Sequence, residues 1–293
     1  MAKYQHIVAA VELDGADIPV VAAAQRIADQ QSAKLSILTV VRPVTHLYAG
    51  LDTVLGPEFE AQLRQAAQSE VKNLCRTRHV PERCARVDVG EPGATIAEFA
   101  ERHAADLIVV GAHDRHGLEY FVGTNATAVL HRAHCDVLGV RVPSSEGNYR
   151  LIVVGIDGEP GSREVLDRAR DIARGGNVHV VLVVKPPLSG YAVSSDEFAD
   201  NPLLDDLAAM EQHVIEVVQG LVDSAGFANV EVEVLHGKPS QQIKRYLQRI
   251  GADLVVMGSG DHVGVGWMIG STTNNVLHGG SCDALVVRKR LET

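Results

Sequence analysis

The stretch GADLVVMGSGDHVGVGWMIGS at residues 251–271 decides how the chain is organised, because the chain contains a second version of it. The counterpart, AADLIVVGAHDRHGLEYFVGT, lies at residues 104–124. The same shift along the sequence, without a gap, relates CDALVVR at 282–288 to CDVLGVR at 135–141. Matches of this length at a constant shift are the signature of internal duplication, so the chain is predicted to contain two tandem copies of one unit.

Each copy alternates short apolar runs with segments of helical periodicity. Runs such as VVLVV and LIVV suit parallel strands that helices cover on both faces, and the apolar stripe over 18–31 suits one of those helices. The predicted fold is therefore α/β, with two tandem open, doubly wound, parallel sheets of five strands each. The strands are expected at 6–12, 35–41, 85–89, 106–111 and 137–142 in the first copy and at 151–156, 178–184, 230–236, 253–258 and 283–289 in the second.

The two copies meet at the polar stretch PSSEGNY, which suits a short linker. We expect one domain over residues 1–143, a linker over 144–149 and a second domain over 150–293. A connection longer than is typical follows the second strand of each copy, at 45–63 and at 189–212. These two connections are expected to form lids over the strand ends or surfaces for a partner.

Composition and charge argue against several classes of protein. The net charge is −10 and no basic block is present, which argues against nucleic acid as a partner. No apolar run approaches the ~18 residues that a membrane span needs, and the first residues lack the features of a signal peptide, so a cytoplasmic protein is expected. The four cysteines form no CxxC pair, which indicates ordinary reduced thiols.

The glycine-rich connection that follows the strand at 253–258 is the candidate ligand loop. Ligands of open α/β sheets bind beyond the carboxyl ends of the strands. Gly258 and Gly270 would let the backbone approach a ligand closely, and the N–H groups of Ser271 and Thr272 could bind phosphate oxygens. The stretch matches neither the P-loop nor the GxGxxG fingerprint, so a connection that binds nothing stays open as an alternative.

The paired segments DLIVVGAHDRHG…GTNATAVLHRAHCDVLGVRV and DLVVMGSGDHVG…GSTTNNVLHGGSCDALVVRK resemble the C-terminal half of the universal stress protein domain. The start HIVAAVELDG and the GEP and GKP turns fit the same family. The resemblance covers nearly the whole chain, twice, as in tandem members similar to universal stress protein E. It implies a Rossmann-like, adenine nucleotide alpha hydrolase-like fold with the two domains packed as an internal pseudo-dimer. Some members bind ATP through a G-x2-G-x9-G-[ST] loop.

The resemblance also implies a set of nucleotide-binding residues in each half. In the second half, a carboxylate would hold the adenosine end, a valine backbone would contact adenine, and the glycine loop would hold the phosphates. This set is Asp157, Val184, Gly258, Asp261, Gly270, Ser271 and Thr272. The weaker first-half set is Glu12, Val40, Gly111, Asp114, Gly123, Thr124 and Asn125.

Three carboxylates depart from the pattern of the family's nucleotide-binding members. Asp114 and Asp261 stand where those members often have glycine, and a carboxylate repels phosphates unless a cation lies between them. Each aspartate therefore either recruits Mg²⁺ with the nucleotide or caps a turn. Glu12 stands where the family has aspartate, and its longer side chain would crowd the adenosine site. The second half is thus the predicted site for a nucleotide.

The predicted function is a stress-response protein in which ATP or another adenine nucleotide is a regulatory ligand. Two alternatives stay open: a stress-related interaction or scaffold protein that binds no nucleotide, and a slow ATPase or adenylyl-transferring enzyme. No GxSxG elbow or other catalytic constellation is visible, so no catalytic residue is named and no metal ligand is predicted apart from Asp261 through Mg²⁺-nucleotide. A protein partner and a homodimer of tandem chains are the further assemblies considered, without nucleic acid or membrane.

Overall fold

A computed structural model describes residues 3–15, 17–43, 57–112, 124–141, 147–159, 161–184, 202–260 and 269–288, and it shows two α/β units joined through one ten-stranded sheet. In the first unit the elements are β1 (His6–Val11), α1 (Ile18–Gln31), β2 (Lys34–Val41), α3 (Pro57–Thr77), a 3-10 turn η1 (Glu82–Cys84), β3 (Ala85–Val89), α4 (Pro92–Arg102), β4 (Leu107–Gly111), α5 (Thr124–Arg132) and β5 (Asp136–Val140).

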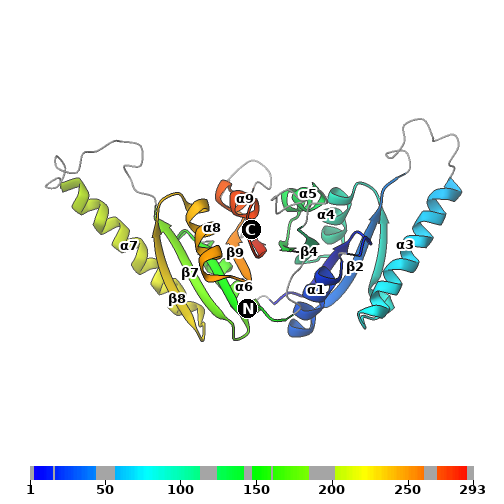
Figure 1. Ribbon diagram of the computed structural model, residues 1–293, viewed down its shortest axis with the longest axis horizontal. Helices are drawn as coiled ribbons and strands as arrows, with labels where there is room; N and C mark the ends of the chain where they lie inside the picture. Colours follow the sequence, from blue (N-terminus) through cyan, green and yellow to red (C-terminus); the bar gives the residue numbers. More distant parts are fainter. Residues whose placement is uncertain are drawn as a thin grey trace.

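The second unit repeats this order of elements (Figure 1). Each strand of both units lies within two residues of its predicted bounds. The elements are β6 (Leu151–Ile156), α6 (Ser162–Ala173), β7 (Asn177–Val184), α7 (Pro202–Ala225), β8 (Val230–His236), α8 (Pro239–Ile250), β9 (Leu254–Gly258), α9 (Ser271–Leu277) and β10 (Asp283–Val287).

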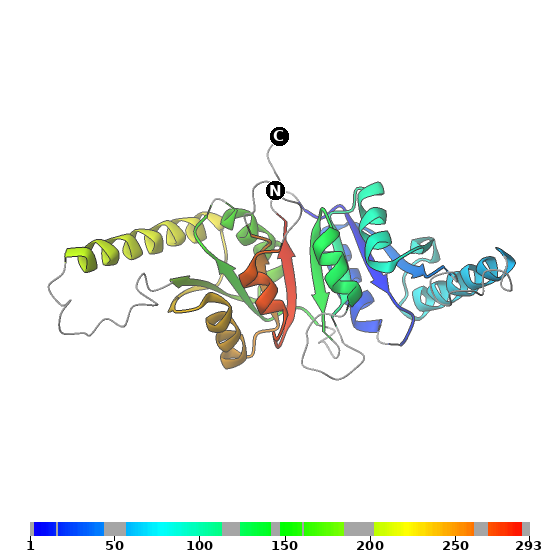
Figure 2. The same ribbon diagram turned by 90° about the horizontal axis from the view of Figure 1, so that it is seen from above.

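The strand order is β3-β2-β1-β4-β5-β10-β9-β6-β7-β8, so each unit contributes five parallel strands. The two five-stranded sheets meet edge to edge, because β5 and β10 pair antiparallel with Leu138 opposite Leu285. Figure 2 shows these two strands side by side at the centre of the molecule. The α/β expectation is confirmed, and the last strand of each unit is the element that joins the two.

Helices cover both faces of the sheet, which explains why inner strands such as β1, β4 and β6 are apolar without alternation. Along β1, Ile7 and Ala9 pack into the core beneath α1, α3, α6 and α7, whereas Val8 and Ala10 pack into the core beneath α4, α5, α8 and α9. Successive side chains of a strand point to opposite faces, so a strand with two covered faces needs an apolar residue at every position. None of the described helices is long and apolar enough to cross a membrane.

The repeated GEP and GKP turns have a conformational cause. Gly90 and Gly237 have φ of +154° and +128°, a region that favours glycine. A Cβ added at Gly90 would lie 2.3 Å from the Thr95 hydroxyl oxygen. Pro92 and Pro239 then start α4 and α8, at the helix position where a missing N–H costs nothing. The turn is therefore duplicated because it starts an equivalent helix in each unit.

The long connections predicted at 45–63 and 189–212 are partly helical. Residues from Pro57 and from Pro202 belong to the helices α3 and α7, and Figure 1 shows these helices at opposite ends of the long axis. The preceding residues 45–56 and 189–201 lie outside the described part of the chain. The prediction of a lid or a partner surface therefore now concerns only residues 45–56 and 189–201, and it stays a prediction.

Two buried carboxylates hold the joint between the units in a pseudo-symmetric way. Asp136 accepts hydrogen bonds from the Tyr4 hydroxyl at 2.7 Å and from the Arg288 backbone N–H at 2.8 Å. Asp283 accepts the equivalent bonds from Tyr149 at 2.8 Å and from the Arg141 N–H at 2.9 Å. Tyr4 belongs to the unit of Asp136 and Arg288 to the other one, so each carboxylate connects the two units.

An arginine from the opposite unit makes the Asp136 end of this joint an ion pair. Arg168 Nε lies 3.0 Å from Asp136 Oδ2, and both side chains are only 5% exposed. Burial nevertheless raises the pKa of the Asp136 carboxyl to about 6, because the loss of hydration outweighs the attraction of Arg168. The Arg168 guanidinium also lies 4.4 Å from the centre of the Tyr4 ring, so charge, ring and hydroxyl form one packed cluster.

Candidate functional site

A pocket of about 430 Å³ opens in the second unit at the carboxyl ends of β6, β7 and β9. The starts of α6, α8 and α9 complete its walls. In parallel sheets these strand ends share one edge, which is where open α/β folds place their ligands. The volume falls within the ~300–1,000 Å³ that is typical of small-molecule sites.

The pocket brings together most of the residues predicted for the second half. Asp157 directly follows β6, and Gly258 ends β9. Gly270, Ser271 and Thr272 lie at the start of α9 and line the same pocket. Asp261 lies outside the described residues, so its roles as a Mg²⁺ ligand or as a turn cap both stay predictions.

Val184 does not line the pocket, and its neighbour Val183 does. The two side chains point to opposite faces of β7, and that of Val184 packs into the core beneath α6 and α7. The carbonyl of Val184 already accepts a hydrogen bond from the Gly237 N–H at 3.0 Å. In the first unit the Val41 carbonyl accepts the equivalent bond from Gly90, so Val40, predicted as the counterpart of Val184, corresponds to Val183 instead.

Asp157 is held along its own loop. Its Oδ1 accepts hydrogen bonds from the Ser162 hydroxyl at 3.0 Å and from the Glu159 N–H at 3.2 Å. Ser162 starts α6 and lines the pocket beside Asp157. The carboxylate is therefore oriented before any ligand arrives. Sequence reasoning did not identify Ser162, although a serine at a helix start five residues after an aspartate was a usable signal.

The glycines of the loop pack against each other. Gly260 has φ of +90°, and a Cβ added there would lie 3.0 Å from Gly270 Cα. The Gly270 N–H donates to the Ser259 carbonyl at 2.6 Å, and the Thr273 hydroxyl donates to the Gly258 carbonyl at 2.7 Å. These bonds bring the two ends of the loop together at the mouth of the pocket. Close backbone packing thus accounts for Gly260 and Gly270 whether or not a ligand is bound.

The lining of the pocket combines apolar and polar groups. The apolar wall consists of Val165 of α6 on one face of the sheet and of Ile243 of α8 with Met257 of β9 on the other. The hydroxyl residues at the start of α9 and the Asp157 carboxylate supply the polar groups. Such a site suits a ligand that combines a flat or apolar part with hydroxyl and anionic groups. The apolar wall comes from the core-facing stripes of α6 and α8, so sequence patterning alone gave no sign of its ligand-facing role.

The first-unit residues are arranged differently at the equivalent edge. The Asn125 side-chain N–H donates to Glu12 Oε1 at 2.8 Å, and its carbonyl oxygen accepts from Arg42 at 3.3 Å. Gly111 ends β4, and Thr124 is the first residue of α5. Asp114 and Gly123 lie outside the described residues. Glu12 and Asn125, both predicted from sequence, are thus in contact with each other.

The thiols of Cys135 and Cys282 are poor nucleophiles. Burial raises the pKa of Cys135 and of Cys282 to about 12, so neither is a thiolate nucleophile near neutral pH. Within the described parts of the chain, no group of three or more His, Cys, Asp or Glu residues could hold a metal ion. His113 and Asp114 of the first loop lie outside those parts.

A sequence model of the Universal stress protein family matches the chain twice, over residues 3–141 and 148–288. The chain belongs to the universal stress protein family. Universal stress protein A homolog 2 of Coxiella burnetii is 32% identical over 146 residues, which are 50% of this chain and 100% of that protein. Universal stress protein A homolog 1 of the same organism is 33% identical over 138 residues, 47% of this chain and 96% of that protein. Each of these relatives therefore corresponds to a single domain of this chain.

Solved structures match the tandem arrangement as a whole. A universal stress protein from Archaeoglobus fulgidus has a TM-score of 0.67 and 16% identity, and the match covers 97% of this chain and 98% of that chain. A functionally unknown protein from Pseudomonas aeruginosa has a TM-score of 0.70 and 17% identity, with 97% and 92% covered. At this identity the similarity concerns the fold, and it supports the tandem universal stress protein architecture.

Proposed function

We propose that this tandem universal stress protein binds an adenine nucleotide in the pocket of its second domain and uses it as a regulatory ligand. The observation that carries the proposal is the composition of the pocket. The lining combines a carboxylate that its own loop orients, apolar side chains, and glycines with hydroxyl residues at the start of α9. A nucleotide offers groups that match each of these, with ribose hydroxyls, a flat base and phosphates.

The adenosine end is assigned to the rim with Asp157. Because Oδ1 is already occupied by Ser162 and by the Glu159 N–H, the second carboxylate oxygen is the acceptor offered to a ribose hydroxyl. Carboxylates at the ends of strands commonly hold ribose hydroxyls in nucleotide-binding α/β folds. Val165 and Ile243, which come from helices on opposite faces of the sheet, would contact the base from two sides.

The phosphate end is assigned to the rim with Gly258, Gly270, Ser271 and Thr272. Glycines leave the backbone N–H groups accessible, and the two hydroxyl side chains add further donors. Lys238 does not line the pocket, but it is exposed and directly precedes Pro239, which does, so it adds a positive charge to this edge of the domain. A triphosphate would also bring Mg²⁺, and the resemblance assigns Asp261 as a second-half residue near it.

The mechanism is regulation through binding. A nucleotide that holds the two ends of the loop would favour one loop arrangement over others, and a partner that recognises that arrangement would sense the ligand. This assigns no chemical step to the chain. Slow ATP hydrolysis and adenylyl transfer are the competing activities, and turnover that disappears with a pocket substitution would support either of them.

Equilibrium binding of ATP measured by isothermal titration calorimetry, with excess Mg²⁺ and again with EDTA, tests the proposal. The wild-type chain should bind saturably. Ser271→Glu, which puts a carboxylate at the phosphate rim, should weaken binding at least tenfold, about 1.4 kcal/mol. Gln241→Glu is the matched control, because it adds the same charge on α8 at an exposed residue that does not line the pocket.

Two results would overturn the proposal. Absence of saturable binding at millimolar ATP would leave the interaction or scaffold role as the function. Equal affinities for wild type and Ser271→Glu would place a nucleotide site elsewhere on the chain.

A further inference from the structure

Polar side chains form a continuous bridge across the ligand-binding edge of the first domain. Glu12 directly follows β1, and its Oε1 accepts from Asn125 in the first turn of α5 at 2.8 Å. Asn125 accepts from Arg42, which directly follows β2, at 3.3 Å. Arg42 in turn lies 3.9 Å from Glu91, directly before α4. The bridge thus spans two strand ends and two helix starts.

Two of the equivalent positions line the open pocket in the second domain. Asp157 directly follows β6, as Glu12 follows β1, and Thr272 is the second residue of α9, as Asn125 is of α5. The equivalent of Glu91 is Lys238, directly before α8, and the equivalent of Arg42 lies outside the described residues. In the second domain, however, the carboxylate bonds back to Ser162 and to the Glu159 N–H of its own loop. Among the described residues, the Asp157 carboxylate makes no hydrogen bond to α9. The two domains therefore use the carboxylate after their first strand in opposite ways.

Asp17 explains why Glu12 is available for the bridge. In the first domain the buried Asp17 carboxylate accepts from the Glu12 backbone N–H at 2.8 Å, so Asp17 stabilises the loop between β1 and α1. Asp157 performs that task in the second domain and bonds within the loop. Glu12 has one more methylene than aspartate, and its side chain reaches the amide of Asn125 on another helix.

The charges around the two sites also make the first domain less favourable for an anionic ligand than the second. Directly before the first-turn proline, α4 has Glu91 whereas α8 has Lys238. Among the four bridging residues Glu12, Arg42, Glu91 and Asn125, two are negative and one is positive. An anionic ligand would therefore meet a net negative rim in the first domain and a lysine in the second.

We propose that the Glu12–Asn125 bridge, together with Glu91, closes the first-domain cleft to anionic ligands, so that the chain carries one nucleotide site and not two. The inference rests on the proposed function of the second-domain pocket. In this arrangement the first domain binds no nucleotide. The Glu12 carboxylate is bonded to Asn125 at the position where the second domain offers the Asp157 carboxylate to a ligand.

Isothermal titration calorimetry with Mg²⁺-ATP measures how many nucleotides each chain binds, and this number tests whether the bridge closes the first-domain site. We expect one nucleotide per wild-type chain, and binding at least tenfold weaker in Ser271→Glu. Adding Glu12→Asp and Glu91→Lys to the Ser271→Glu chain shortens the carboxylate and introduces the charge that the second domain has. This triple variant should bind one nucleotide per chain, at least tenfold more tightly than Ser271→Glu alone.

A matched control makes the same two kinds of change away from the bridge. Glu101→Asp with Glu98→Lys alters exposed positions further along α4, and in the Ser271→Glu chain it should create no site. Thermal melting checks that every variant is folded. A second nucleotide on the wild-type chain that persists in Ser271→Glu would overturn the inference, as would failure of the triple variant to gain binding.

The proposed function and the inference fail in different ways. If the wild type binds no nucleotide, the proposed function is wrong. Glu12→Asp with Glu91→Lys in the otherwise wild-type chain then decides the inference: a new site supports closure by the bridge, and no site contradicts it.

Discussion

His6 starts β1 with both of its ring nitrogens in hydrogen bonds. Nδ1 lies 3.0 Å from the His103 carbonyl, and Nε2 lies 2.9 Å from the Ser36 hydroxyl. The residue is only 4% exposed, and burial lowers its pKa below the usual 6.5. The folded chain therefore favours the neutral ring, whereas the unfolded chain binds a proton near pH 6.5.

Linkage gives the sign of the effect on stability. The unfolded state binds more protons below about pH 6.5, so the contribution of His6 is present above that pH and is lost as the pH falls. We expect His6→Gln, which stays neutral and can hydrogen-bond, to lose less unfolding free energy than wild type between pH 7.5 and pH 5.5. Urea unfolding at both pH values measures this. An equal loss in the two proteins would show that His6 does not titrate as its surroundings indicate.

For individual residues, the sequence indicated where the ligand-binding edge lies, but not the orientation of the side chains at that edge or their hydrogen-bond partners. Asp157 and Glu12 occupy equivalent positions, and only the structure shows one bonding within its loop and the other bonding to Asn125. Gly260 was missed because its need for glycine comes from φ of +90° and from contact with Gly270. Such orientations depend on tertiary contacts, which a single sequence does not display.

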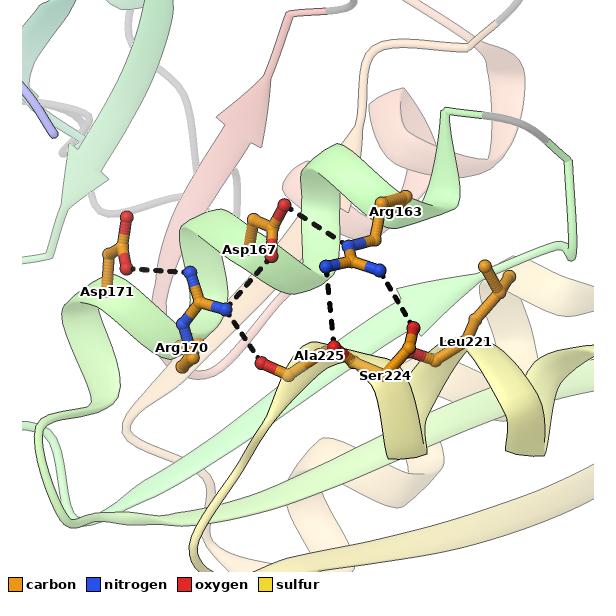
Figure 3. A network of polar contacts seen from close by, with 7 residues as sticks. All are labelled: Arg163, Asp167, Arg170, Asp171, Leu221, Ser224 and Ala225. Atoms are coloured by element: carbon orange, nitrogen blue, oxygen red, sulfur yellow. Dashed lines mark hydrogen bonds and ion pairs between the residues drawn. The ribbon is translucent and has the colours of Figure 1, made fainter. Parts of the chain in front are cut away.

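Among the helices, α7 is fixed at its C-terminus by two arginines of α6, as Figure 3 shows. Arg170 donates to the carbonyl of Ala225, the last residue of α7, at 2.7 Å. Arg163 donates to the Ser224 hydroxyl at 2.8 Å. Positive charge near the unpaired carbonyls of a helix C-terminus is favourable. The clamp also keeps α7 over the loop after β6, where a Cβ at Gly158 would lie 3.6 Å from Val214.

The two arginines should contribute unequally. Arg170 is 17% exposed and Arg163 is 43% exposed, so solvent screens the second more strongly. We expect Arg170→Ala to lower the unfolding free energy by about 1.5–3 kcal/mol, and Arg163→Ala by about 0–1 kcal/mol. Denaturant unfolding measures both, and hydrogen exchange should quicken in the last turn of α7 in Arg170→Ala. Equal costs would contradict a role for burial in the clamp.

At the level of elements, strands were easier to predict than the long helices. Parallel strands with two covered faces leave continuous Val and Ile runs, and those runs placed several of the inner strands, whereas the edge strand β8, VEVEVLH, alternates polar and apolar residues. The helices α3 and α7 begin inside segments that were treated as long connections, at 45–63 and 189–212. Pro57 and Pro202, each at a first helical position, were the signals available for these starts.

The joint between the domains makes the two halves of the molecule dependent on each other. β5 and β10 pair antiparallel, so the end of each strand lies beside the other domain's last helix. The Arg141 guanidinium donates to the Gly280 carbonyl just beyond α9, and the Arg288 guanidinium donates to the Leu130 carbonyl in α5. Each domain thus caps the final helix of the other. Sequence duplication predicted two units, and the family resemblance implied that they pack as an internal pseudo-dimer; the pairing of β5 with β10 and these caps are visible only in the structure.

The reciprocal caps have different consequences for a ligand, because α9 lines the second-domain pocket and α5 carries Asn125 of the bridge. Arg141→Lys keeps the charge and the backbone bond to Asp283 but loses the planar donor fork at Gly280. We expect about a threefold to tenfold loss of Mg²⁺-ATP affinity, close to the ~1 kcal/mol of one hydrogen bond.

Arg288→Lys is the mirror-image control for this substitution. It removes the bond to the Leu130 carbonyl inside α5, whereas Arg141→Lys removes a bond to a carbonyl beyond the end of α9, and both variants should have a lower melting temperature than wild type. Its nucleotide affinity should match that of wild type, because the cap that it removes lies on the first-domain helix. Calorimetric titration and thermal melting of both variants separate positioning of α9 from general stability. An equal loss of affinity in the two variants would mean that the joint acts on the pocket only through overall stability.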